Sequence, residues 1–195
     1  MYGKRGIQNL AQGSIGPLRM DQFGKLVVGD DLSEAALNCR LFLAANQTAV
    51  ACSTTLNTTW TGLALVNPTG SGKVFIVHEF SWALSVVGPA AGLLALASTT
   101  DSGFATNITP RCAKWGAASS VAIVDDGATV VAPIILHPIT TYGTGAITTW
   151  QGAGFQVAKI NGGIVIPAGR SLLTDTTTAC SAAFQFGFVW EELDA

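Results

Sequence analysis

Residues 58–87 read TTWTGLALVNPTGSGKVFIVHEFSWALSVV, and the second half of this stretch alternates apolar and polar side chains. Alternation with a period of two places successive side chains on opposite faces of an extended strand. One face would hold Val74, Ile76, His78, Phe80, Trp82, Leu84 and Val86, and the other Lys73, Glu79, Ser81 and Ser85. A shorter apolar run, Trp60 to Val66, comes first, and turn-forming residues from Asn67 to Gly72 separate the two runs. The pattern predicts a β-hairpin.

The turn segment PTGSGK, residues 68–73, is similar to a phosphate-binding loop but departs from that pattern at both ends. The pattern needs a glycine where this chain has Asn67, and a serine or threonine where it has Val74. Such a loop must also open a helix whose amides meet the phosphates, whereas the residues after Lys73 alternate as a strand. We therefore expect an ordinary turn and no bound nucleotide.

Composition favours a single domain with an uncharged surface. Charged residues make up 11% of the 195-residue chain and hydrophobic residues 49%, and the net charge is -2. A chain of this length can bury a core without disulfides or metals. The weak negative charge argues against a nucleic-acid binder, and a neutral surface suits a protein that packs against other protein.

Two segments bear on membranes and export. Phe80 to Thr100 has no charged residue over 21 positions, but Gly88-Pro89 interrupts it and its first half alternates as a strand does, so we expect no membrane partner. Gly6 to Gly16 is too polar for the apolar core of a secretory signal, so we expect the chain to stay in the cell or leave by lysis.

Short candidate strands, separated by turn residues, continue along the rest of the chain. They cover 92–98, 121–124, 129–136, 147–150, 155–160, 163–166, 170–175 and 179–192, and the segment 41–51 contains the first strand. Residues 101–120 are expected to form a long loop, and 31–37 one or two helical turns. We predict an all-β fold, an antiparallel β-sandwich over residues 41–195, most specifically a jelly roll of about eight strands.

Residues 1–40 are predicted to form an extended N-terminal arm. Their apolar residues stand singly between Gly, Gln, Asn and Pro, and five of the ten basic residues of the chain lie there. Such a segment cannot bury itself, so it either packs along its own domain or reaches onto neighbouring subunits; we favour the second arrangement. The residues expected to contact a partner are Tyr2, Lys4, Arg5, Ile7, Leu10, Leu18, Arg19 and Phe23.

No residue pattern indicates catalysis, a metal or a cofactor. The four cysteines are widely spaced and are expected to be free buried thiols. The adjacent acids Asp125-Asp126 and Glu191-Glu192 should point to opposite faces of a strand or toward water, so they make poor catalytic pairs. His78 is expected to be a satisfied core histidine, and His137, before a proline, to end a strand.

A family resemblance rests on the arm, on the Thr/Ala/Gly-rich β domain and on the pattern NGGIVIPAG, residues 161–169, leading into the long last strand. This combination resembles tailed-phage virion structural proteins, more narrowly the jelly-roll capsid decoration or cement proteins. The resemblance implies non-enzymatic work on the capsid surface by a protein made in the host cytoplasm. It also implies a homo-oligomer, often a trimer, that binds and stabilises the major capsid protein lattice.

Two alternative functions stay open from the sequence. One is a hydrolase, which would need two acids that converge across a cleft; the other rests on the tryptophans. Tryptophans at positions 60, 115 and 150 are not all placed by strand alternation, and exposed aromatic side chains can stack on sugars. Core packing is the simpler explanation for tryptophans in a β-sandwich. If they are exposed, the protein would instead be a tail or fibre-associated module that binds a receptor or glycan.

Overall fold

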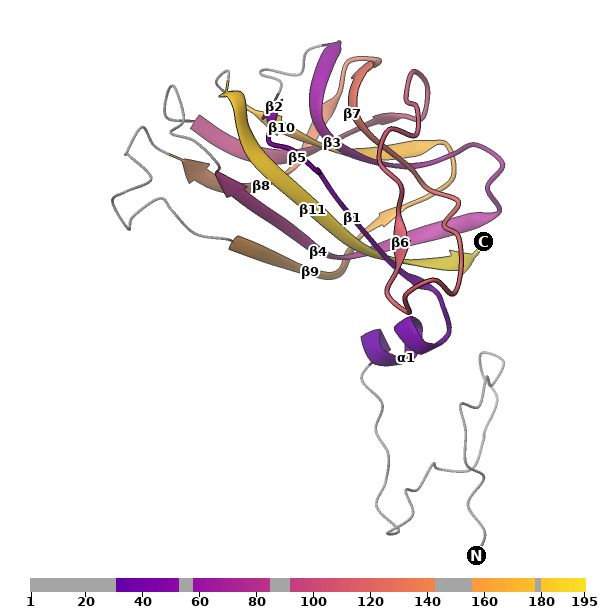
Figure 1. Cartoon of the computed structure of the whole chain (residues 1–195). Coiled ribbons are helices and arrows are strands. Elements are labelled where there is room, and N and C mark those ends of the chain that lie inside the picture. Colours follow the sequence, from indigo (N-terminus) through magenta and orange to yellow (C-terminus); the bar gives the residue numbers. More distant parts are fainter. Residues whose placement is uncertain (1–30, 53–57, 85–91, 143–155, 178–179) are drawn as a thin grey trace, which may run out of the picture.

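The computed structural model describes residues 31–52, 58–84, 92–142, 156–177 and 180–195, which form two antiparallel β-sheets packed face to face (Figure 1). This confirms the all-β sandwich. The elements are α1 (Asp31–Leu37), β1 (Leu41–Ala45), β2 (Val50–Cys52), β3 (Thr59–Asn67), β4 (Lys73–Leu84), β5 (Gly92–Thr100), β6 (Arg111–Cys112), β7 (Ile123–Thr129), β8 (Ile134–Tyr142), β9 (Gln156–Ile166), β10 (Arg170–Thr176) and β11 (Cys180–Asp194).

Strand pairing is nested from the ends of the domain inward. One sheet has the order β6-β1-β11-β4-β9, with β2 also paired to β11, and the other has the order β7-β3-β10-β5-β8. Within these sheets β1 pairs with β11, β3 with β10, β4 with β9 and β5 with β8, all antiparallel. These four pairs join eight strands in the way that the two arms of one long hairpin pair, the first strand with the last and so on inward. Two of the pairs lie in each sheet, so the long hairpin is folded into two layers.

The core between the sheets is built largely from aromatic side chains of β4 and β11. Phe80 stacks against Phe186 and makes a tilted contact with Phe188, with ring centroids 5.8 and 5.2 Å apart. Phe184 and Trp190 complete a row of buried aromatic residues along β11, as the alternation of that strand predicts. Burial of so much aromatic surface holds the two layers together.

The expected β-hairpin of residues 58–87 is wrong, because β3 and β4 lie in different sheets. The segment between them is an arch that crosses from one layer to the other. Asn67 is fully buried at the end of β3, and its side-chain amide donates to the carbonyls of Lys73 and Ile166 at 2.8 and 2.9 Å. These two bonds tie β3 to both β4 and β9 of the opposite sheet.

The inward face of β4 changes at His78. Strand β11 pairs with Glu79 and then with Val77, so His78 is an extra residue in β4, a β-bulge. Phe75 and Val77 are fully buried before the bulge, and Phe80 after it. The expectation that residues 74, 76 and 78 face inward is therefore wrong, since one inserted residue reverses the side of all that precede it.

Several strand limits also differ from expectation. Strand β7 runs straight through 125–127, and β9 runs through 161–163 by means of a register shift at which Asn161 and Gly162 have positive φ. Strand β8 begins at Ile134, later than expected. The candidate strand 147–150 lies outside the described residues.

Helix α1 confirms the helical turns expected at 31–37, and it packs against the β domain. Ala35 is fully buried, and Cys39 adopts a positive φ where the helix ends. The carbonyl of Arg40 accepts a hydrogen bond from the amide of Glu192 on β11 at 2.9 Å. The part of the expected arm that the structure describes, residues 31–40, is thus attached to the sandwich.

Candidate functional site

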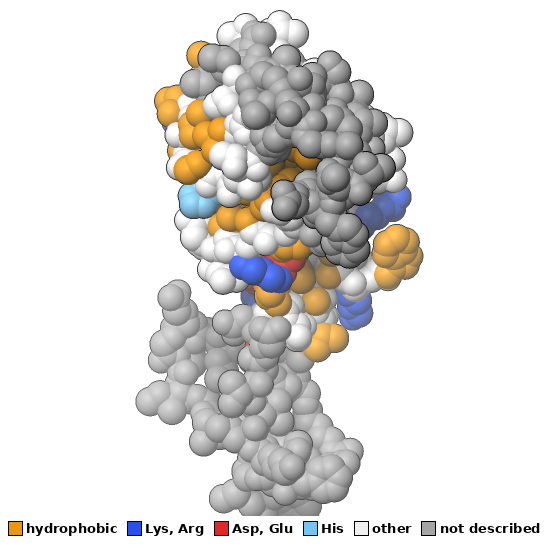
Figure 2. Space-filling model, turned by 90° about the vertical axis from the view of Figure 1, so that its left-hand side faces the viewer, with side chains coloured by type: hydrophobic (Ala, Val, Ile, Leu, Met, Phe, Trp, Pro, Cys, Tyr) orange, Lys and Arg blue, Asp and Glu red, His pale blue; other side chains and the backbone are white. Residues whose placement is uncertain are grey.

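Strands β8 and β9 each end their sheet, and an apolar surface lies where these two edges meet. Ile134 and Leu136 of β8 are 69% and 53% exposed, and Val165 of β9 is 54% exposed. With exposed Pro167 they line a hollow of about 300 Å³. We call these four residues the edge patch. Figure 2 views this side of the molecule and shows hydrophobic side chains reaching the surface, with a few charged groups beside them. Exposed Arg170 also lines the hollow.

Strand β8 is a poor template for the addition of another strand. Its pairing with β5 skips Leu136 and Ile139, so the strand carries two bulges, and Pro138 between them has no amide hydrogen. Such features protect sheet edges from backbone pairing with other chains. Contacts at this edge would therefore be made by side chains, and the bulge helps to turn Leu136 outward.

The position of His137 corrects one expectation. It lies inside β8 and is exposed, rather than at the end of a strand. The following proline is tolerated because β8 is an edge strand, where a missing amide costs no ladder hydrogen bond.

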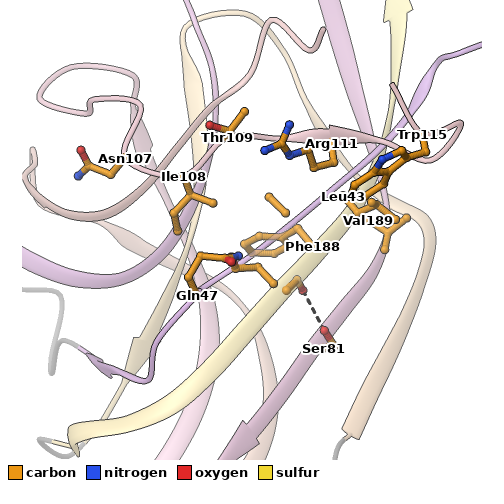
Figure 3. Close-up of a pocket in the computed structure, with 13 residues that line it drawn as sticks. Leu43, Gln47, Ser81, Asn107, Ile108, Thr109, Arg111, Trp115, Phe188 and Val189 are labelled. Carbon is orange, nitrogen blue, oxygen red and sulfur yellow. Dashed lines mark hydrogen bonds between the residues drawn. The ribbon is translucent and has the colours of Figure 1, made fainter. Parts of the chain in front are cut away.

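A second hollow, of about 600 Å³, lies on the outer face of the six-stranded sheet beside the loop 105–116 (Figure 3). Its lining on the sheet includes three small residues, Ala45, Gly187 and Ser81, beside the larger Leu43, Phe188 and Val189. Trp115 stands over Leu43 and Val189 at one end, and Gln47 lies across the hollow, as Figure 3 shows. We call this hollow the Trp115 groove.

The wall of the Trp115 groove is held by regular local structure. Arg111 lies in β6 and pairs with Leu43 of β1. Trp115 lies in a turn in which the amide of Ala117 donates to the carbonyl of Lys114 at 3.0 Å, and Gly116 supplies the positive φ that the turn requires. The Trp115 side chain at this turn is 83% exposed.

Of the three tryptophans that suggested a sugar platform, only one is shown on the surface. Trp60 is buried, and its indole donates to the carbonyl of Thr174 at 2.8 Å. Trp115 is exposed, and residue 150 lies outside the described residues. Strand alternation does not reach Trp115, because it belongs to a loop.

The adjacent acids of β11 have separate structural partners. Glu192 is buried and accepts hydrogen bonds from the Ser120 hydroxyl, from the Val121 amide at 3.3 Å and from the Trp190 indole at 3.2 Å. Glu191 forms an ion pair with Arg40 at 3.2 Å. They point to different sides, as predicted, and Glu192 fastens the loop before β7 to the sandwich.

His78 is not the satisfied core histidine that the sequence predicts. Its Nε2 atom is buried and makes no hydrogen bond, although it lies 3.6 Å from a carboxylate oxygen of Glu191. The bulge places it at the edge of the core, with its side chain 15% exposed.

The described residues include cysteines but no cluster of metal ligands. Cys52 and Cys112 are buried cysteines outside any disulfide, as predicted, while Cys39 is only partly buried. No three His, Cys, Asp or Glu side chains of residues 31–52, 58–84, 92–142, 156–177 and 180–195 lie close enough to hold a metal ion. The described residues include no helix with the length and apolar character needed to cross a membrane.

The predicted partner-contacting residues, Tyr2, Lys4, Arg5, Ile7, Leu10, Leu18, Arg19 and Phe23, all lie outside the described residues. Comparison with protein-family models, with curated proteins and with solved structures finds no match to this chain.

Proposed function

We propose that the protein is a non-enzymatic virion structural subunit, a capsid decoration protein that binds and stabilises the lattice of the major capsid protein. In this proposal the edge patch joins copies of the chain into a homo-oligomer, with a trimer as the expected state. The N-terminal segment, residues 1–30, contacts the capsid. The protein would be made in the host cytoplasm and would reside on the capsid surface.

The edge patch is the observation that carries the proposal. A soluble monomer gains nothing by holding Ile134, Leu136 and Val165 in water on an edge, and clusters of this kind are typical of association surfaces. Fully burying an aliphatic side chain contributes roughly 1.5–3 kcal/mol, so the exposed parts of Ile134 and Leu136 would contribute about 1–2 kcal/mol each.

Association through the edge patch alone would be weak. Bringing two proteins together costs an estimated 4–15 kcal/mol of lost translational and rotational freedom, which a few aliphatic side chains per copy barely offset. On a symmetric shell the edge-patch contacts would be repeated and would act together with those of the N-terminal segment, which raises the overall affinity. The proposal therefore places strong binding on the lattice and weak oligomerisation in solution.

We also infer that the sandwich is a jelly roll. The nested pairing of β1 with β11, β3 with β10, β4 with β9 and β5 with β8 supports this topology, since two interlocked Greek keys produce eight strands in that arrangement. Jelly rolls occur in viral capsid and lectin domains, and a rigid sandwich suits a protein that must resist force.

Sedimentation velocity of the full chain over a range of concentrations tests the role of the edge patch. We expect concentration-dependent association, and Leu136→Gln should weaken it about tenfold or more. Val121→Thr is the matched control, because Val121 is 40% exposed outside the edge patch and should leave association unchanged. A strictly monomeric wild type, or equal effects of the two substitutions, would contradict the proposal.

Co-sedimentation with the phage's own capsids tests the N-terminal segment. Deletion of residues 2–30 should abolish capsid binding and leave a folded protein whose weak association in solution is unchanged. If the shortened protein decorates capsids as the full chain does, the N-terminal segment is not the anchor.

A further inference from the structure

The Trp115 groove has features that assembly through the edge patch does not use. It combines an aromatic face that is 83% exposed with a concave floor and an exposed guanidinium group, that of Arg111. Its volume of about 600 Å³ falls within the usual range of small-ligand sites. Figure 3 shows Trp115 and Arg111 on the same wall, with Gln47 facing them across the floor.

The electrostatic character of the groove favours an anion. Residues 109–120 include Arg111 and Lys114 and no acidic residue. Among the described residues, no carboxylate lies within ion-pair distance of Arg111. Two carboxylates accept hydrogen bonds from the side-chain amide of Asn107, which lines the groove: that of Asp125, which is buried, and that of Asp126, which is partly buried and lies 3.3 Å away. Neither is paired with Arg111. An acidic ligand would therefore meet a cation with no competing partner.

We propose that the Trp115 groove binds a carboxylated sugar, such as a uronic or sialic acid residue of a glycan. The indole of Trp115 stacks on the apolar face of the sugar ring, and the planar fork of the Arg111 guanidinium pairs with the carboxylate through two parallel hydrogen bonds. The amide oxygen of Gln47 accepts hydrogen bonds from the sugar hydroxyls, and the hydroxyl of Thr109 accepts or donates them.

The shape of the groove distinguishes this occupant from the other partners of the chain. The small floor residues Ala45 and Gly187 leave a hollow that a flat protein surface would not fill, whereas a ring lying against Trp115 does. The N-terminal segment 1–30 is basic, so it is a poor match for the cations at 111 and 114. Glycan binding in the Trp115 groove would add receptor recognition to the proposed capsid decoration role. It does not depend on that role.

Binding of the full-length protein to an array of carboxylated glycans tests the proposal, followed by calorimetry with trigalacturonate and sialyllactose. Maltotriose and lactose are their neutral counterparts. We expect at least one carboxylated glycan to bind tenfold or more tightly than its neutral counterpart. Rising NaCl should weaken its binding, because an exposed ion pair is screened.

Trp115→Ala and Arg111→Gln should each weaken binding tenfold or more, and Arg111→Gln should also remove the preference for the acid and the salt dependence. Lys114→Gln is the comparison, because it removes the same charge from a neighbouring residue that does not line the groove. It should weaken binding less than Arg111→Gln does and should leave the preference for the acid intact. Unchanged urea midpoints would show that the variants fold.

Three results would overturn the proposal. The first is that no carboxylated glycan binds more tightly than its neutral counterpart. The second is that Trp115→Ala leaves binding unchanged. The third is that Trp115→Ala and Arg111→Gln disrupt association between copies or with capsids while no sugar binds, which would make the groove a protein interface. The edge-patch variant Leu136→Gln should bind sugars normally. Loss of glycan binding can therefore be distinguished from loss of association through the edge patch.

Discussion

The buried carboxylate of Asp125 attaches the loop 105–107 to β7, and its replacement with alanine should be strongly destabilising. The side chain is 1% exposed and accepts hydrogen bonds from the Ala105 amide at 2.7 Å and from the Asn107 side-chain amide at 2.5 Å. It also accepts from the backbone amides of Asp126 and Gly127 at 2.8 and 3.2 Å. Four donors thus converge on one carboxylate.

The expected cost follows from these contacts. Hydrogen bonds to a charged group contribute roughly 1.5–3 kcal/mol each, and a buried donor left without a partner costs about 1–3 kcal/mol. The four bonds share one side chain and are not additive, so we expect Asp125→Ala to lower the free energy of unfolding by about 3–5 kcal/mol. That is a large part of the roughly 5–15 kcal/mol by which domains are stable.

The neighbouring acid provides a matched control. Asp126 carries the same charge but is only partly buried, and its side chain accepts one long hydrogen bond, from Asn107 at 3.3 Å. Asp126→Ala should therefore change the free energy of unfolding by no more than about 0.5 kcal/mol. The two variants have the same net charge, so any difference reports burial and hydrogen bonding.

Urea unfolding followed by tryptophan fluorescence measures both values. With a slope of about 2 kcal/mol per molar urea, the midpoint of Asp125→Ala should fall by roughly 1.5–2.5 M, and that of Asp126→Ala should barely move. Hydrogen exchange of the Ala105 and Asn107 amides should become faster in Asp125→Ala. Equal midpoints for the two variants would refute the reasoning, because they would mean that the converging bonds contribute nothing.

Two further outcomes follow from local geometry. Gly103→Ala should lower the free energy of unfolding by about 2 kcal/mol or more, since Gly103 has a φ of 91° and an added Cβ would overlap the carbonyl oxygen of Thr129. Gly116 has a φ of 76° and free space around it, so Gly116→Ala should lower the free energy of unfolding by only about 1 kcal/mol. The urea midpoints of the two variants test this difference. The backbone amide of Thr69 donates to Asp101 at 2.7 Å and holds the pKa of the Asp101 carboxyl below its ordinary value of 3.8. The ionised Asp101 therefore stabilises the fold fully above pH 3.8, and this stabilisation is lost as the pH falls through the lowered pKa. Asp101→Asn should accordingly lose less stability between pH 5 and pH 2 than the wild type. Thermal melts of both proteins across this pH range test the prediction, and melting temperatures that fall in parallel would contradict it.

Strand positions were readable from the sequence where a strand has one buried face and no irregularity. Strand β11 is the best case, since Phe184, Phe186, Phe188 and Trp190 recur at every second position and all four are buried. Strand β7 was misplaced because Asp125-Asp126-Gly127 is a common turn sequence. Here the long-range bonds of Asp125 to the loop 105–107 override that local preference.

The candidate sites could be predicted only in part. The exposure of Ile134 and Leu136 depends on β8 being the last strand of its sheet, which strand patterns do not specify. An apolar run reads the same in an edge strand as in a central one. The sequence singled out Trp115 among several tryptophans but could not tell which of them reach the surface, because burial in a loop depends on what packs against it.

The amino-acid pattern alone established an all-β chain of short strands with a charge-poor surface, because alternation with a period of two and frequent turn residues are local properties of the chain. It could not establish which strands pair. Turn residues such as those at 67–73 occur both in hairpins and in arches between layers. Here the side-chain amide of Asn67 stabilises the arch by its bonds to the carbonyls of residues 73 and 166, which belong to the opposite sheet. The inward face of β4 was likewise set by the bulge at His78, which exists only because β11 lies beside it.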